Sequence, residues 1–312
     1  AGDAMKLQQL RYVLEVFRHG NHISNAAEAL HTSQPGISKH LQQLEEELGF
    51  EIFARKRNRI VGLTEPGEEV VTIAQRVLND IDSLKRLGEE LSSREGGSLT
   101  IATTHTQARY VLPQVIERFI RQHPKVQLHL RQGNPTQICE MVEAGVADLA
   151  VGTETTRAFP TLVRMDCFEL ERSIITKVGH PLLKIRKPTL RDVSAYPIIT
   201  HDPAFSGRWK VIDAFKRAGI SPNIIFGAVD ADVSKTYVEL GLGIAVMTSV
   251  SIDKQKDKGL RAIDASHLFE ASMTSISVRI NAYLRNHTFD FIRMFAPHLT
   301  RDAVRNALQE AR

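Results

Sequence analysis

The sequence contains few cysteines and no long apolar run. The 312 residues include two cysteines, Cys139 and Cys167, too few for a disulfide framework and without C-x-x-C spacing. We expect free thiols in a reducing cytoplasm, with redox sensing as the alternative. No segment approaches the roughly 20 apolar residues that span a bilayer, and the N-terminus has no apolar signal-peptide core. The sequence therefore predicts a cytoplasmic protein with no membrane contact, in which residues 1–4 are a cloning remnant.

A dominant charge of one sign is also missing. Lys and Arg number 40 against 36 Asp and Glu, which leaves a net charge of +4 and a pI of about 9.1. This balance is compatible with a nucleic-acid partner but does not require one. The length is sufficient for two domains or three lobes.

Catalytic spacings are absent as well. His105, Cys167 and Asp202 are the residues that an enzyme could use, yet none stands at nucleophile–base or metal-ligand spacing from another. A histidine in a strand-to-helix turn, such as His105, is more often a hydrogen-bonded structural residue. We therefore expect no catalysis, no metal and no cofactor.

Helical spacing of apolar residues predicts three short helices near the N-terminus. The first runs from Leu7 to Gly20, and the second follows Ser24 as its N-cap. The third begins after Ser33, a good N-cap, and continues to Gly49. Helix, short turn and helix with a polar leading edge is the helix-turn-helix arrangement, whose second helix enters the major groove of DNA.

Polar residues on the third helix and its leading edge could contact DNA. Gln, Ser and Lys side chains donate to and accept from base edges and phosphates, although the same residues occur on any solvated helix face. The expected contacts are Ser33, Gln34, Pro35, Ser38, Lys39 and Gln42.

A basic hairpin after the third helix strengthens the DNA interpretation. Two short β-prone runs in "EIFARKRNRIVGLT" flank a turn with four cationic residues: Arg55, Lys56, Arg57 and Arg59. Such a turn repels itself without a polyanion, and a wing that follows the DNA backbone supplies one. We expect the acidic run 45–47 to lie apart from this charge, at the far end of the third helix.

A long amphipathic helix is predicted from Thr64 and Pro66 to about Arg94, with a hinge at 95–98. Its apolar residues recur at intervals of three, four or seven: Val70, Ile73, Val77, Ile81, Leu84 and Leu91. About 28 residues at 1.5 Å each span roughly 42 Å, too long for a module of about 60 residues to cover. We expect the stripe to pair with its copy in a second subunit. Packing against the following domain is the alternative.

The remaining chain alternates strands and helices. Residues 99–152 give strand, helix, strand, helix and strand, and a second series follows from about Leu170 to Ser249. This alternation predicts parallel sheets covered by helices, and two such lobes form a hinged clamp. Ligands of open α/β sheets bind beyond the carboxyl ends of the strands.

The turn after the first of these strands has hydroxyl and amide side chains, and no glycine or lysine. Thr104, Thr106 and Gln107 stand at the start of a predicted helix, whose unpaired N–H groups favour an anion. Neutral donors suit a small, fully ionised oxyanion such as sulfate. Thr153 after another strand and Ser206 before a helix of the second lobe indicate the same site. The alternative is that the threonines only cap helices.

The segment "AAEALHTSQPGISKHLQQLEEELGFEIFARKRNRIVGLTEPG" resembles the signature of the LysR-type transcriptional regulators. Within that family, "TTHTQARYVLP", "QGNPTQICEMV", "DADVSKTYVELGLGIAV" and "FIRMFAPHLTRD" are similar to the CysB-like subgroup, which governs sulfur-assimilation genes. The resemblance implies an α/β fold class with three parts: a winged helix-turn-helix over 5–65, a linker (dimerisation) helix over 66–95, and a periplasmic-binding-protein-like effector domain over 96–312. The expected lobes of that domain are about 98–166 plus 268–300, and 167–267.

The resemblance also implies a function. A protein of this subgroup binds double-stranded operator DNA as a homodimer or homotetramer and regulates cysteine-biosynthesis genes. Its effector is a small anion or acetylserine bound between the lobes, such as sulfate, thiosulfate, O-acetylserine or N-acetylserine. The positions that match the subgroup's effector contacts are Thr104, Thr106, Gln107, Thr153 and Ser206.

Departures from the subgroup lie near the expected pocket. Ser206 stands where we expect threonine and keeps the hydroxyl. His201 and Asp202 replace more neutral residues, and Leu170 replaces an aromatic one. These differences concern the organic part of the ligand, so a regulator of organosulfonate or sulfate-ester use fits equally well. A small-molecule-binding protein without DNA function, or an enzyme, is the alternative of a different class.

Overall fold

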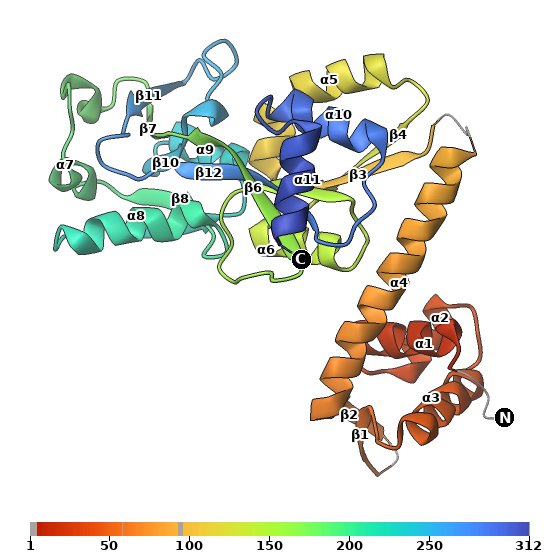
Figure 1. Cartoon of the computed structure of the whole chain (residues 1–312). Coiled ribbons are helices and arrows are strands. Elements are labelled where there is room, and N and C mark those ends of the chain that lie inside the picture. The colour runs from red at the N-terminus through yellow and green to blue at the C-terminus, as the bar shows by residue number, and fades with distance from the viewer. Residues whose placement is uncertain (1–4, 58, 93–95, 312) are drawn as a thin grey trace. The chain divides into compact units, whose positions relative to one another are not determined.

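The computed structural model describes residues 5–57, 59–92 and 96–311, which form two compact units that divide after Gly88 (Figure 1). The expectations for residues 1–4, for Arg94 and for the start of the hinge fall outside these ranges. Over the described residues, every helix is too short or too polar to cross a membrane.

The N-terminal unit is a winged helix-turn-helix. Its elements are α1 (Leu7–Arg18), α2 (Ile23–Ala29), α3 (Gln34–Leu48), β1 (Phe53–Lys56), β2 (Arg59–Leu63) and most of α4 (Glu65–Leu91). The strands β1 and β2 pair as an antiparallel hairpin. Ile37, Leu41 and Leu44 of α3 are fully buried in the core of this unit. The predicted helix-turn-helix and basic hairpin are therefore confirmed.

Local caps explain where α3 begins and ends. The Ser33 hydroxyl accepts a hydrogen bond from the Gly36 N–H at 3.2 Å, and Gly49 ends the helix with a φ of +79°, which glycine adopts without strain. The cap predicted for α2 is wrong. This helix begins at Ile23, with His22 at its N-cap position, so Ser24 lies inside it.

The helix α4 packs part of its apolar stripe, including Val70 and Val77, into the core of its own unit. The Thr64 hydroxyl caps the helix by accepting from the Gly67 N–H at 3.0 Å. Five residues of the first half pack into the winged-helix core: Val70, Val71, Ala74, Val77 and Leu78. The expectation that so small a module leaves the stripe uncovered is therefore wrong for Val70 and Val77, whereas Ile73 between them is 46% exposed. Further along, Leu84 and Leu91 are 68% and 75% exposed.

A charge at Leu84 tests whether the exposed half of α4 contacts a second subunit. Leu84→Asp should give smaller species in light scattering at micromolar concentration, because a carboxylate cannot be buried in an apolar helix seam without a large cost. The neighbouring exposed residue supplies the control, Lys85→Asp, which should keep the parent's mass. An unchanged mass for Leu84→Asp would rule out this part of α4 as the dimer contact.

The C-terminal unit consists of two α/β lobes, each built on a five-stranded sheet. In lobe I the strand order is β4-β3-β5-β12-β6 and in lobe II it is β11-β7-β10-β8-β9. The lobe I strands are β3 (Ser98–Thr103), β4 (Gln127–Gln132), β5 (Leu149–Gly152), β6 (Leu162–Leu170) and β12 (Ser272–Arg279). The lobe II strands are β7 (Arg172–Lys177), β8 (Ile198–His201), β9 (Ile224–Ala228), β10 (Ile244–Thr248) and β11 (Leu260–Asp264).

Helices pack around both sheets. Those of lobe I are η1 (Gln107–Val111), α5 (Pro113–Gln122), α6 (Pro135–Glu143), α10 (Asn286–Phe295) and α11 (Arg301–Glu310). Those of lobe II are η2 (Pro181–Lys184), α7 (Leu190–Ser194), α8 (Ser206–Arg217), α9 (Ala231–Glu239) and η3 (Ser249–Ser251). Separate apolar clusters fill the interiors of the two lobes.

Two connections join the lobes. Parallel pairing of β3 with β4 and β5, and of β8 with β9 and β10, confirms the predicted strand–helix alternation. The remaining strands pair antiparallel: β6 leads through Glu171 into β7, and the chain returns through Ala271 into β12 (Figure 1). Polar side chains near these two connections are therefore within reach of residues of both lobes.

Both cysteines are free and lie in lobe I. Burial raises the pKa of Cys139 to about 11 and that of Cys167 to about 12. A thiol with so high a pKa stays protonated at neutral pH and is a poor nucleophile.

Candidate functional site

A groove of about 1180 Å³ on the N-terminal unit lies between α3 and the hairpin. Gln34, Ser38 and Gln42 of α3 line one side, and Arg55 and Arg59 of the hairpin line the other. The structure thus gathers five of the ten predicted DNA contacts in one concave face. Residues of α2 and the turn before it also line this groove: Asn21, His22, Ile23 and Ser24.

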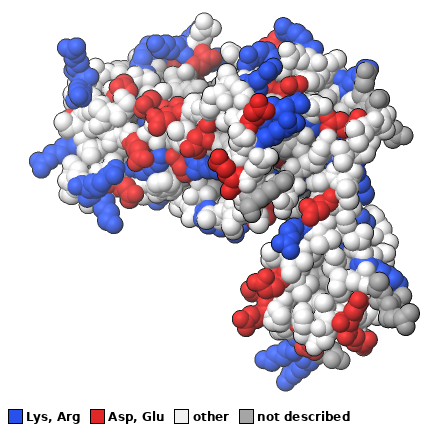
Figure 2. Space-filling model, viewed as in Figure 1, with Lys and Arg blue, Asp and Glu red and all other residues white. Residues whose placement is uncertain are grey.

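The other predicted DNA contacts lie outside this groove. Ser33 caps α3 and Pro35 stands in its first turn, so these two residues position the helix. Lys39 is exposed on α3, and Lys56 and Arg57 are exposed near the tip of the hairpin. Figure 2 shows Lys and Arg side chains gathered at this tip. Arg57 has a φ of +49°, a tight-turn conformation that is uncommon for a residue other than glycine.

Arg55 is held by a carboxylate from α3. Its Nη2 lies 2.7 Å from Glu45 Oε2, while Glu45 Oε1 accepts from the Ile52 and Phe53 N–H groups at 2.8 and 3.2 Å. Glu45 is buried, whereas Glu46 and Glu47 are exposed. The expectation that the whole acidic run stays apart from the basic hairpin is therefore wrong. Glu45 supports the hairpin, a role that sequence reasoning missed.

A row of hydroxyl groups lies where the lobes of the C-terminal unit meet. The Ser206 Oγ is 3.2 Å from both Thr153 Oγ1 and Ser272 Oγ. Thr153 follows β5 of lobe I, Ser206 begins α8 of lobe II, and Ser272 begins β12. The structure therefore brings the predicted residues Thr153 and Ser206 together across the lobes. We call Thr153, Ser206 and Ser272 the hydroxyl row.

Gln107 reaches the same strand from lobe I. Its Nε2 donates to Thr274 Oγ1 at 3.0 Å, and its Oε1 is buried without a hydrogen-bond partner among the described residues. Ser272 and Thr274 lie on one face of β12, because alternate residues of a strand point to the same side. Sequence reasoning missed both residues.

The two remaining predicted residues come directly after β3. Thr104 is buried and Thr106 is half-buried. Within the described residues neither hydroxyl forms a hydrogen bond, and Thr106 does not cap the following helix. The structure therefore does not support the alternative that Thr106 is only a helix cap.

The helix after β3 differs from the expected α-helix. Gln107–Val111 forms a π-helical turn, in which the Leu112 N–H donates to the Gln107 carbonyl at 2.8 Å, and α5 begins only at Pro113. Such turns recur at functional sites because they redirect side chains. Here the same turn directs Gln107 to β12 and the side chains of Arg109 and Tyr110 to lobe II.

A cluster of charged groups fastens this turn to α9 of lobe II. The Tyr110 hydroxyl donates to Asp232 Oδ1 at 2.5 Å and accepts from Lys235 Nζ at 2.8 Å. Arg109 Nε and His105 Nε2 lie 2.8 and 3.3 Å from Asp232 Oδ2. Burial alone would raise the pKa of Asp232, but the hydrogen bonds from Tyr110 and Lys235 lower it. We call these five residues the lobe latch.

The residues that depart from the subgroup pattern lie at the end of β6 and in the segment from the end of β8 to the start of α8. Leu170, the last residue of β6, is buried. Asp202 accepts from the Ala204 N–H at 3.0 Å and so shapes the turn before α8. His201 is buried, and its burial lowers its pKa to about 4, so the imidazole is neutral at pH 7. A Cβ at Gly207 would lie 2.6 Å from the His201 ring, so only glycine fits there without a shift.

The N-terminal unit has a polar helix face and a basic hairpin around one groove. The C-terminal unit has two lobes, and polar residues of both meet between them. Together these features define a DNA-binding regulator controlled by a small molecule. The chain belongs to the LysR family of transcriptional regulators. Residues 7–68 match the family described as "Bacterial regulatory helix-turn-helix protein, lysR family", and residues 92–300 match the "LysR substrate binding domain".

Relatives in the family support the CysB-like assignment. The chain is 45% identical to the transcriptional regulator SsuR of Burkholderia cenocepacia, over 98% of this chain and 100% of that protein. It is 44% identical to CysB of the same organism, over 98% of this chain and 97% of that protein. The crystal structure of the cofactor-binding domain of the Cbl regulator covers 70% of this chain and 95% of its own, with 36% identity and a TM-score of 0.67.

Proposed function

We propose that this protein regulates genes of sulfur assimilation and cysteine biosynthesis in response to a small anion or an acetylserine bound between the lobes. The observation that carries the proposal is the hydroxyl row, in which Ser206 of lobe II meets Thr153 of lobe I at 3.2 Å. Side chains from both lobes contact one ligand there, so binding fixes the angle between the lobes. Similarity to CysB and the resemblance to its subgroup support the sulfur assignment.

Regulation of organosulfonate or sulfate-ester use is the second candidate function. Similarity to SsuR is as high as that to CysB. A sulfonate has three oxygens in tetrahedral arrangement around sulfur, as in sulfate, and a carbon in the place of the fourth. The neutral imidazole of His201, buried beside the start of α8, favours an organic group at that end of the site. The two functions share the anion site and differ in the ligand's substituent.

On the DNA side, we propose that α3 lies in the major groove, with Gln34, Ser38 and Gln42 facing the bases. The hairpin tip, with Lys56 and Arg57, then follows the phosphate backbone. Because Arg55 is paired with Glu45, its role in this arrangement is to hold the hairpin more than to neutralise phosphate. A dimer presents two such faces, and an exposed apolar half of α4 supports pairing of subunits.

Calorimetry with sulfate, thiosulfate, O-acetylserine and N-acetylserine tests the proposal, together with retention of an operator duplex selected from a random pool. We expect at least one anion to bind and to change operator affinity. Thr106→Val keeps the side-chain shape but removes a hydroxyl that donates to the anion, worth about 1.5–3 kcal/mol. We therefore expect anion binding to weaken about ten- to a hundredfold, with operator affinity in the absence of anion unchanged.

A threonine of the N-terminal unit supplies the matched control. Thr72→Val on α4 removes a hydroxyl that bonds only to its own helix, at the Glu68 carbonyl, and should bind the anion as the parent does. If neither Thr106→Val nor Ser206→Ala changes binding of any of the four compounds, the anion site lies elsewhere. If the parent binds none of them, the proposed effector class is wrong.

A further inference from the structure

Arg172, at the start of β7, is a buried cation that forms no ion pair with any residue that the structure describes. Its side chain is 0% exposed. Nε donates to the Glu270 carbonyl at 2.9 Å, and Nη2 donates to Ser272 Oγ at 2.5 Å. Both acceptors are neutral, and over the described residues no carboxylate lies within 4.0 Å of this guanidinium. A buried charge needs a counter-charge, because removing it from water is costly.

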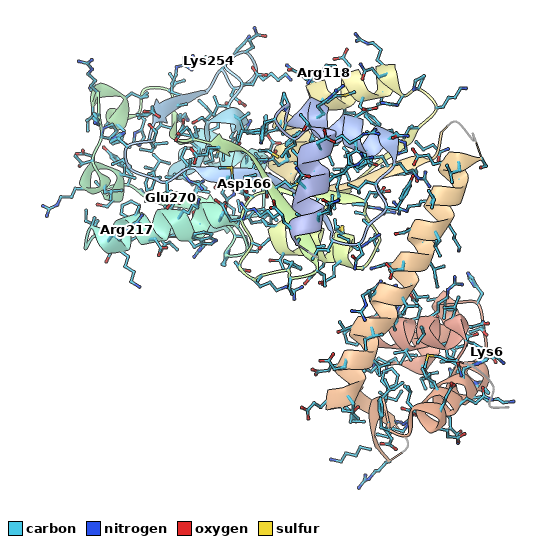
Figure 3. All side chains as sticks on the ribbon, in the orientation of Figure 1. Lys6, Arg118, Asp166, Arg217, Lys254 and Glu270 are labelled. Carbon is cyan, nitrogen blue, oxygen red and sulfur yellow. The ribbon has the colours of Figure 1, made fainter. Side chains whose placement is uncertain are left out.

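Three carboxylates act on Arg172 from a distance, those of Glu154, Glu270 and Glu171, and none of them forms an ion pair with it among the described residues. Lys210 of α8 is 5% exposed and pairs at 2.7 Å with Glu154, which is 18% exposed. Glu270, labelled in Figure 3, is 63% exposed and therefore well solvated. Lys210 thus has two carboxylate partners, Glu154 and, at 3.4 Å, Glu270, whereas the contacts of Arg172 are to neutral oxygens. Burial lowers the pKa of Arg172 to about 10, so the guanidinium still carries its charge at neutral pH.

Arg172 is connected directly to the hydroxyl row. Ser272 Oγ accepts from the guanidinium, so its own proton is left to donate onward, since a hydroxyl has a single donor. The next oxygen is Ser206 Oγ at 3.2 Å, followed by Thr153 Oγ1 at a further 3.2 Å. Hydrogen bonds in such a chain polarise one another. Because Ser206 donates to Thr153, the proton left for a ligand between the lobes is that of Thr153 Oγ1 at the end of the row.

The start of α8 adds to the positive potential. Ser206 and Gly207 are the first residues of this 12-residue helix, which has no side-chain cap, and unpaired N–H groups at such a terminus favour an anion. A Cβ at Gly207 would lie 3.4 Å from Arg172 Nη1, so the guanidinium packs against the helix start. Independently, His201 Nδ1 is buried beside Gly207 without a partner among the described residues.

We propose that Arg172 is the counter-charge of the effector and makes the site selective for a permanently ionised oxyanion of the sulfate or sulfonate class over a neutral molecule of the same shape. It is a positioning residue, because it acts on the ligand through the hydroxyl row, from Ser272 to Ser206 to Thr153. The inference rests on the proposed function, since it requires an effector at the hydroxyl row.

The test compares ligands that differ in charge but hardly in shape. Calorimetry of the full chain with sulfate, methanesulfonate and neutral methanesulfonamide measures the charge selectivity of the parent and of Arg172→Gln. We expect the parent to prefer methanesulfonate over methanesulfonamide at least tenfold, and Arg172→Gln to bring this ratio close to one while weakening sulfate binding at least tenfold. Arg172→Lys, which keeps the charge, should retain most of the selectivity. Structural damage alone would weaken methanesulfonate and methanesulfonamide binding equally. An unchanged ratio of these two affinities in Arg172→Gln would therefore overturn the proposal.

A second variant covers the case in which Arg172→Gln does not fold. Ser272→Ala breaks the connection but leaves Arg172 bound to the Glu270 carbonyl, and should weaken sulfate binding about tenfold. Its control is Ser277→Ala, another buried serine of the same strand on the opposite face, which should bind as the parent does. Sulfate affinity within twofold of the parent in Ser272→Ala or Arg172→Gln overturns the inference and leaves the proposed function standing. Absence of binding by the parent to any of the effector anions overturns both.

Discussion

Replacing Glu45 by alanine should weaken operator binding about a hundredfold while leaving the C-terminal unit folded. Glu45 accepts hydrogen bonds from the buried N–H groups of Ile52 and Phe53 and from the guanidinium of Arg55. Each buried donor that loses its acceptor costs about 1–3 kcal/mol. We expect about 2.8 kcal/mol of this loss to appear in DNA affinity, equivalent to a factor of 100, because the hairpin no longer holds its place beside α3. Fluorescence anisotropy with a labelled operator duplex measures the effect.

Three comparisons isolate the role of Glu45. Glu45→Gln keeps an acceptor for the backbone and should lose about tenfold, whereas Glu47→Ala, an exposed residue of the same acidic run, should bind as the parent does. Arg57→Ala should weaken binding to all sequences and reduce the salt slope by about one, as expected for a phosphate contact. Operator affinity of the parent's strength in Glu45→Ala, with the protein folded, would mean that the hairpin is held by other contacts.

Local patterns were sufficient to predict the elements whose ends depend on nearby residues. Ser33 and Gly49 cap α3, and Thr64 caps α4, because the groups that they bond lie within a few residues. The cap of α2 was mispredicted because its start depends on the tertiary structure: Ile23 packs into the core of the N-terminal unit and enters the helix as its first residue.

Residues that act through long-range contacts could not be found in this way. Glu45 looks like any residue of an acidic surface run, and only its distance to the hairpin shows that it is buried and bonded. Ser272, Thr274 and Arg172 belong to antiparallel strands whose pairing joins distant segments, and no local spacing marks them. By contrast, Thr153 and Ser206 were predictable because each follows a strand of its own lobe, at the edge of an α/β sheet where ligands bind.

The π-helical turn at Gln107–Val111 shows a different limit. One extra residue per turn changes which side chains share a face, and the apolar spacing of α5 continues after it without a break. The sequence therefore predicted that Gln107 faces the effector site but not that Tyr110 contacts α9. That second contact joins the turn that carries Gln107 to lobe II, in addition to the contact of Ser206 with Thr153.

Breaking the lobe latch should weaken effector binding about as strongly as Glu45→Ala weakens DNA binding. In Asp232→Ala, the side chains of Arg109 and His105 lose their partner on lobe II, and Tyr110 keeps only Lys235 there. Bonds to a charged group contribute about 1.5–3 kcal/mol each, and exposure of Arg109 and His105 to solvent reduces their share. We expect a net loss of about 2.8 kcal/mol, which is a hundredfold decrease in apparent affinity, because fewer molecules hold the two lobes in the binding-competent arrangement.

Graded variants and a distant control separate loss of the latch from loss of the fold. Tyr110→Phe removes one hydroxyl but leaves Lys235 bonded to Asp257 at 3.0 Å, so calorimetry with the tightest-binding of the four compounds should show about a tenfold loss. Asp213→Ala, at an exposed position of α8, should bind as the parent does, and urea unfolding should give similar midpoints for Tyr110→Phe and the parent. Arg109 and Tyr110 of the latch lie on the same π-helical turn as Gln107. Asp232→Ala should therefore also reduce the anion's effect on operator binding. Parent-like anion affinity in folded Asp232→Ala would show that the hydroxyl row keeps its geometry without this cluster.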